Sequence, residues 1–191
     1  MPKIERNIEP GSIHHVYNRS VEKRTIFFID RDYQWFLEKI AFYKVKYKVK
    51  ILAFALLPNH WHLLVQEQEV VQPPALATPG VVRMIGDLCN AYVKRFNIAH
   101  DRSGPLFQGR FKSKVVEDEH YLQNLINYIN LNPVKHKIVK NIKDWDYTSH
   151  WHYLEKGKFA LVDKSEFIDF AVYKAGVVDY LRKFENIEEE F

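Results

Sequence analysis

The strongest constraint on the fold of this 191-residue chain is the order in which helix-like and strand-like stretches follow one another. Two stretches, from Arg31 to about Lys48 and from Val81 to Phe96, repeat apolar residues every three or four positions, which predicts amphipathic helices. Other stretches are β-prone and are bounded by turn residues. The expected strands are 13–18, 49–57, 60–66 and 111–116. The order strand, helix, strand, strand, helix, strand predicts a ferredoxin-like (RRM-like) α+β fold, with an antiparallel sheet and both helices on one face.

The chain continues beyond this core pattern. We expect an appended helix over 117–132 that is stopped by Pro133, and Asp30 is expected to cap the first helix. The segment from 68 to 80 is rich in Pro and predicts a surface loop. One main domain is therefore expected over 1–142. A C-terminal extension over 143–191, rich in aromatic residues and acidic at its end, is expected to pack on it.

Composition narrows the function classes. The chain is 47% hydrophobic, but no apolar run approaches the ~20 residues that span a membrane, and residues 1–6 lack a signal peptide's apolar stretch. We therefore expect a cytoplasmic protein with no membrane partner. Residues 1–150 contain 22 Lys and Arg against 15 Asp and Glu. This basic excess favours a nucleic acid as partner, although a solvated lysine-rich surface explains it equally well.

The motif His60-Trp61-His62 carries the first chemical signal. In extended backbone alternate side chains share a face, so the two imidazoles would stand side by side while Trp61 faces the other side of the sheet. Two histidines that leave coordination positions open suit a catalytic divalent ion. The alternative is that one histidine packs in the sheet and the other is solvated.

A second signal lies on the appended helix. Tyr128 and Asn132 are four residues apart and so share a helix face. A phenol becomes a useful nucleophile when a nearby positive centre stabilises its oxyanion, and an amide oxygen can bind the same ion. Taken alone, Tyr128 is a packing residue and Asn132 a helix terminator.

Three ordered segments resemble one family. The segments Leu57–Val65, Gly104–Lys112 and Tyr128–Lys135 resemble those of the IS200-like tyrosine transposases, especially the REP-associated branch, over about residues 11–139. The resemblance implies an endonuclease that cuts single-stranded DNA near a hairpin through a transient 5′-phosphotyrosine link. It implies that His60, His62 and Asn132 bind the metal, expected to be Mg²⁺ or Mn²⁺, and that Tyr128 is the nucleophile. Asn132 stands where compact relatives have the longer glutamine.

DNA contacts are expected from basic residues in three places: a turn after the first strand, the glycine-containing loop and the end of the appended helix. These residues are Arg19, Lys23, Arg24, Arg110, Lys112, Lys135 and Lys137. Arg110 follows a glycine that permits close backbone approach to a phosphate, although a helix-capping or salt-bridged arginine is the equal alternative. The expected partner is single-stranded DNA with a hairpin.

Other functions and assemblies remain open at this stage. Hydrolases with a triple-histidine strand motif share the first two histidines, but the third position here is Leu64. A non-catalytic binder of single-stranded nucleic acid with a ferredoxin-like fold is the main alternative. The sequence fits both a monomer and a homodimer that exchanges the catalytic helix between subunits.

Overall fold

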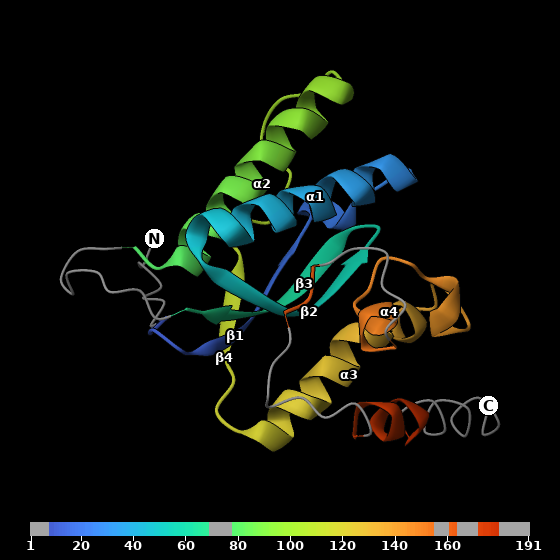
Figure 1. The fold of residues 1–191 in the computed structure, drawn as a ribbon. Helices are drawn as coiled ribbons and strands as arrows, with labels where there is room; N and C mark the ends of the chain where they lie inside the picture. Colours follow the sequence, from blue (N-terminus) through green and yellow to red (C-terminus); the bar gives the residue numbers. More distant parts are fainter. Residues whose placement is uncertain (1–7, 69–77, 155–160, 164–171, 180–191) are drawn as a thin grey trace.

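The computed structural model describes residues 8–68, 78–154, 161–163 and 172–179, and its centre is a four-stranded antiparallel sheet (Figure 1). The strands are β1 (Ile13–Arg19), β2 (Val49–Leu57), β3 (His60–Glu67) and β4 (Lys112–Val115). Their order across the sheet is β2-β3-β1-β4. This order and the two crossing helices confirm the predicted ferredoxin-like α+β fold.

The helices lie on both faces of the sheet. Helices α1 (Asp30–Tyr47) and α2 (Gly80–Ala99) pack together on one face, and α3 (Glu119–Lys135) crosses the other (Figure 1). Shorter elements are η1 (Val21–Lys23), η2 (Ile142–Asp144) and α4 (His150–Tyr153). The arrangement confirms an appended helix on a ferredoxin-like core.

Each face of the sheet has its own core. Side chains such as Phe54, Trp61 and Leu63 pack with α1 and α2, whereas Leu64 packs with the apolar residues of α3. A bulge in β2 lets Leu52 and Ala53 both point toward α3, because one residue of β3 there faces two residues of β2. The sheet is therefore buried on both sides over β2 and β3.

Two sequence predictions about helix ends are wrong. Helix α3 does not stop at Asn132 but continues through Pro133 to Lys135. Proline lacks the N–H that would bond to the carbonyl of Ile129, and the Asn132 side-chain amide reaches that carbonyl at 3.5 Å instead. Asp30 is the first helical residue of α1 rather than its cap. The backbone N–H groups of Phe28 and Ile29 donate instead to the Asp32 carboxylate.

The start of α2 is held by an acidic side chain from β3. The buried Glu67 carboxylate accepts hydrogen bonds from the backbone N–H groups of Gly80 (2.7 Å) and Val81 (2.8 Å). Gly80 has no room for a side chain, because an added Cβ would lie 2.4 Å from the carbonyl oxygen of Tyr47. Residues 69–77 of the predicted loop lie outside the described residues.

Part of the expected C-terminal extension covers the free edge of β2. The Leu56 N–H donates to the carbonyl of Tyr147, and the Ser149 N–H donates to that of Phe54. His150 is buried and its Nδ1 lies 2.7 Å from the Tyr173 hydroxyl. The acidic end of the extension lies outside the described residues. No helix within the described ranges is long and apolar enough to cross a membrane.

His150 predicts a pH dependence of stability. Burial lowers the pKa of His150 to about 4, and Lys143 adds to the effect. Between pH 6.5 and 4 the unfolded chain binds a proton at this side chain that the folded chain does not, so the free energy of unfolding falls as the pH falls. We expect urea unfolding of His150→Gln to show a shallower fall over this range than wild type. Equal slopes would contradict the prediction.

Candidate active site

Strand β3 presents the two histidines of the motif to the face that α3 crosses. His60 and His62 are mostly buried, with 8% and 7% of their surfaces exposed, and their ring centroids are 5.2 Å apart. Trp61 points the other way and is completely buried against Phe36 and Phe107. The structure thus places both imidazoles side by side, as the sequence predicts.

Strand β1 supplies the neighbours of the two histidines. Tyr17 pairs with His62 across the ladder, and their rings stack at 5.7 Å. Arg19 pairs in the same way with His60. His15 lies on the same face, with its Nε2 atom 2.9 Å from Nδ1 of His62.

Helix α3 brings Tyr128 to this face. Its ring lies edge-on to His62, 6.1 Å between centroids, and 6.4 Å from that of His15. Burial raises the pKa of Tyr128, nearby Tyr17 raises it further, and the Asn132 side chain partly offsets the rise. The phenol is therefore protonated at neutral pH. The Lys135 ammonium lies 4.5 Å from the centroid of the Tyr128 ring.

Asn132 is buried one turn after Tyr128. Its amide Nδ2 donates to the carbonyl oxygen of Tyr128 at 2.8 Å, which fixes the orientation of the amide. Its Oδ1 atom is buried and has no hydrogen-bond partner among the described residues. An unpaired buried carbonyl is costly unless a further group occupies its lone pairs.

The histidines are held neutral by their surroundings. Burial lowers the pKa of His60 to about 4, with His136 and Arg19 adding to the effect. Burial also lowers the pKa of His62 well below its usual value, and nearby His15 contributes. Neutral imidazoles keep a lone pair for a metal ion at neutral pH.

The donor set fits a divalent cation. Two neutral imidazoles and the unpartnered Oδ1 of Asn132 offer nitrogen and oxygen ligands and leave positions open, as in catalytic sites. Within the described residues no group of three or more His, Cys, Asp or Glu side chains is arranged to hold a metal ion. A site here therefore depends on the asparagine as well as the histidines.

Of the predicted DNA-binding residues, some lie beside the histidines and Tyr128, and the others lie further away. Arg19 lies opposite His60, Lys112 lies opposite Tyr17, and Lys135 lies over Tyr128. The turn that contains Lys23 is tied to the turn before His60, because the Lys23 carbonyl accepts a bond from Asn59.

The other predicted basic residues stand further from the rings. The Arg24 guanidinium is paired with Glu22 at 2.9 Å, so part of its charge is neutralised. Arg110 is exposed in the loop that leads into β4. Lys137 is exposed after the end of α3. The structure does not bring these three side chains against the histidines or Tyr128.

Sequence reasoning missed His15, Tyr17 and His136. His15 and Tyr17 alternate along β1 toward the active-site face, but only the register with β3 shows that they meet His62. The ring of His136, at the end of α3, lies 5.0 Å from that of His60. Its spacing of four residues from Asn132 was the available signal, and the expected helix stop at Pro133 concealed it.

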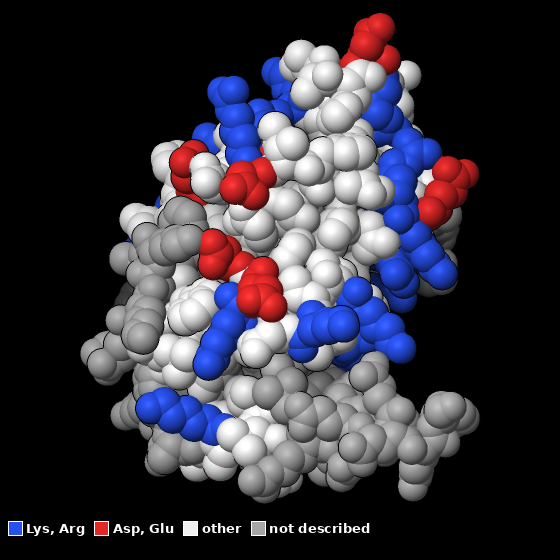
Figure 2. Space-filling model, turned by 90° about the vertical axis from the view of Figure 1, so that its right-hand side faces the viewer, with Lys and Arg blue, Asp and Glu red and all other residues white. Residues whose placement is uncertain are grey.

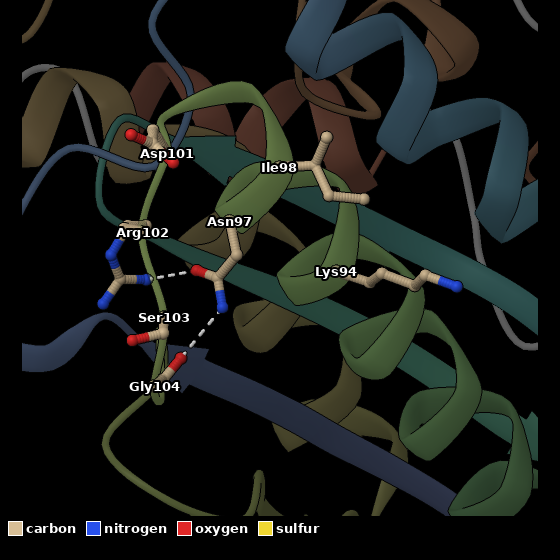
Figure 3. Close-up of a pocket in the computed structure, with 7 residues that line it drawn as sticks. All are labelled: Lys94, Asn97, Ile98, Asp101, Arg102, Ser103 and Gly104. Atoms are coloured by element: carbon tan, nitrogen blue, oxygen red, sulfur yellow. Dashed lines mark hydrogen bonds between the residues drawn. The ribbon is translucent and has the colours of Figure 1, made fainter.

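A surface hollow lies away from these residues. Figure 3 shows it at the end of α2, where Asn97 bonds to Arg102 and to the carbonyl of Gly104. Arg102 also donates to the Pro105 carbonyl and lies over the Phe96 ring. None of the predicted site residues lines this hollow, and its arginine is engaged in holding the loop.

Comparisons with known proteins place this chain in a family. Residues 11–132 match the family described as Transposase IS200 like. A Haemophilus influenzae protein, provisionally named a REP-associated tyrosine transposase, is 33% identical over 108 residues, or 54% of this chain and 60% of that protein. The match thus spans less than two thirds of the relative.

A solved structure extends the comparison of the fold. It is described as a REP-associated tyrosine transposase bound to a REP hairpin. The TM-score is 0.62 at 20% identity, over 90% of this chain and 96% of that one. At this identity the likeness establishes a shared fold.

The placement of Trp61 predicts a structural role for the residue between the two histidines. Trp61→Ala would leave a cavity in the core under α1 and α2 and should lower the free energy of unfolding by about 3–5 kcal/mol. Trp61→Phe should cost less, because it loses less volume and removes an indole N–H with no partner among the described residues. Urea unfolding measures both effects. A loss below about 1 kcal/mol for the alanine variant would contradict this placement.

Proposed function

Because the chain belongs to the IS200-like transposase family, we propose that it is a metal-dependent endonuclease and strand transferase of the REP-associated type. Its substrate is single-stranded DNA next to a hairpin, and Tyr128 is the attacking group. The observation that carries the proposal is the meeting of Tyr128 with His62, 6.1 Å between ring centroids, on one face of one chain. The two residues are 66 positions apart in sequence, and the buried, unpartnered Oδ1 of Asn132 lies one helical turn after Tyr128, which supports the proposal.

The cleavage step transfers the scissile phosphate from the 3′ oxygen of the DNA to Tyr128. The Tyr128 Oη attacks the scissile phosphorus, and the bond to the 3′ oxygen breaks. The phenol loses its proton, and the departing oxygen gains one as a 3′ hydroxyl. The DNA is left joined through its 5′ phosphate to the tyrosine. A 3′ hydroxyl can later attack this ester and release the phenol, so joining needs no nucleotide cofactor.

The phenol requires electrostatic help, because its raised pKa disfavours the oxyanion. We propose that His60, His62 and Asn132 hold Mg²⁺ or Mn²⁺. When bound, such an ion supplies positive charge that polarises the scissile phosphate. The Lys135 ammonium over the Tyr128 ring adds a second positive charge beside the phenol.

We propose that the unpaired DNA strand crosses β1 and β4, the half of the sheet that α3 does not cover. On that half Lys112 of β4 pairs with Tyr17, and Lys114 pairs with His15, so two exposed cations stand one strand away from the site. Arg19 lies at the other end of this row. Figure 2 shows that Lys and Arg side chains also form a band along the right-hand side of that view. A row of cations along the sheet suits the phosphate backbone of a single strand.

The nucleophile can be tested by trapping. We expect wild-type protein, incubated with hairpin-bearing single-stranded DNA and Mn²⁺, to form an adduct that survives denaturing gel electrophoresis. Tyr128→Phe should form none, because it lacks the attacking oxygen, and should still shift the DNA in a native gel. Tyr121→Phe, seven residues earlier on α3, is the matched control and should form the adduct.

Other outcomes separate the alternatives. A native-gel shift with no adduct in wild type would favour a non-catalytic binder. An adduct that persists in Tyr128→Phe would reject Tyr128 as the nucleophile while keeping the nuclease.

The DNA path can be tested through salt dependence. Each lysine or arginine that contacts a phosphate of a single strand contributes about 0.7 to the slope of log affinity against log salt. We propose that Arg110, exposed in the loop that leads into β4, extends this path, and we expect Lys112→Ala and Arg110→Ala each to reduce that slope by about this amount, as measured by fluorescence anisotropy. Lys46→Ala, on the opposite layer in α1, should leave it unchanged. An unchanged slope for Arg110→Ala would remove that residue from the path.

A further inference from the structure

Each of the two motif histidines has one ring nitrogen engaged by a neighbouring side chain. Nδ1 of His60 lies 2.6 Å from Oδ1 of Asn59. Nδ1 of His62 lies 2.9 Å from Nε2 of His15. In both rings the engaged atom is Nδ1, so the Nε2 atom of each is left for another ligand.

The Asn59 contact fixes the tautomer of His60. The Asn59 Nδ2 donates to the backbone carbonyl of Lys23 at 3.0 Å, which turns Oδ1 toward the imidazole. An amide oxygen only accepts hydrogen bonds, so Nδ1 of His60 must carry the proton. Nε2 of His60 then holds its lone pair.

His15 stands in the corresponding position beside His62. Both rings are buried and the two facing nitrogens lie 2.9 Å apart, so one of these nitrogens carries the proton of the hydrogen bond. If His62 donates from Nδ1, its Nε2 is free to bind a cation; if His15 donates, it is not. The rings are also nearly parallel, 21° apart at 5.1 Å, so His15 limits rotation of His62.

We propose that His15 and Asn59 are positioning residues of the metal site. Each accepts the Nδ1 proton of one histidine and thereby points the Nε2 lone pairs of His60 and His62 at a common cation. The inference rests on the proposed function in one respect, that these histidines bind a divalent metal. It adds that metal affinity depends on two residues that never touch the metal.

Metal affinity of the full chain without DNA provides the test. Titration with Mn²⁺, with free Mn²⁺ followed by electron paramagnetic resonance, gives the dissociation constant independently of cleavage. We expect His15→Leu and Asn59→Ala each to weaken binding about 10- to 100-fold, the range typical of such outer partners. His15→Gln, whose amide oxygen can accept the same proton, should recover most of the loss.

The chain offers a matched control in His14. This neighbouring histidine is equally buried but faces the other side of the sheet, where it contacts Ser12 and Ser113. His14→Leu should therefore bind Mn²⁺ as wild type does. A loss in His14→Leu equal to that in His15→Leu would assign the effect to general loosening of β1 and overturn the proposal.

The outcomes separate this inference from the proposed function. If His62→Ala loses Mn²⁺ binding while His15→Leu and Asn59→Ala retain it, the positioning roles are overturned and the metal site stands. If His62→Ala binds Mn²⁺ as tightly as wild type, both the metal site and this inference fail.

A second measurement does not depend on how the variants fold. Nitrogen chemical shifts of the imidazoles in wild type report which ring nitrogen is protonated. We expect His60 to be protonated at Nδ1 without metal, and His62 at Nδ1 with Mg²⁺ bound. An Nε2-protonated His60 would overturn the role of Asn59, and an Nε2-protonated His62 in the presence of saturating Mg²⁺ would overturn that of His15.

Discussion

The alternation of side chains along β3 is the constraint on which the rest of the structure depends. In extended backbone each residue faces opposite its neighbours, so the strand that buries Trp61 and Leu63 under α1 and α2 must turn His60 and His62 to the other face. A slip of one residue would bury both imidazoles in the apolar core and expose the indole. The free energy gained by packing the tryptophan therefore also holds the histidines in place.

Helix α3 meets a second constraint, because the same helix covers the sheet and places Tyr128 beside the histidines. Its apolar residues, such as Ile126 and Ile129, fill the core over β2, and this leaves Tyr128 at the border between that core and the open half of the sheet. The phenol is thus partly desolvated, and its pKa rises. In the proposed reaction the oxygen needs nearby positive charge before it attacks, and the proposal assigns this charge to Lys135 and to an ion held by the histidine pair and Asn132.

The buried polar groups of the site depend on one another. His62 has a partner in His15, His60 in Asn59, and Asn59 in the backbone of the Lys23 turn. Buried polar groups are stable when their hydrogen bonds are made, so these contacts also limit how the rings can turn. Because α3 packs on the sheet of its own chain, the histidines and Tyr128 meet without a second copy.

The sequence by itself determined the fold class, the strand that carries His60 and His62, and the shared helix face of Tyr128 and Asn132. Those features follow from periodicity, which acts between residues near in the chain. Helix α3 ends later than Pro133 predicts, and the Asn132 side-chain amide lies 3.5 Å from the Ile129 carbonyl that the proline cannot bond. Only the tertiary structure decided that His15, Tyr17 and His136 join the site, since strand register and helix docking set those contacts between residues distant in sequence.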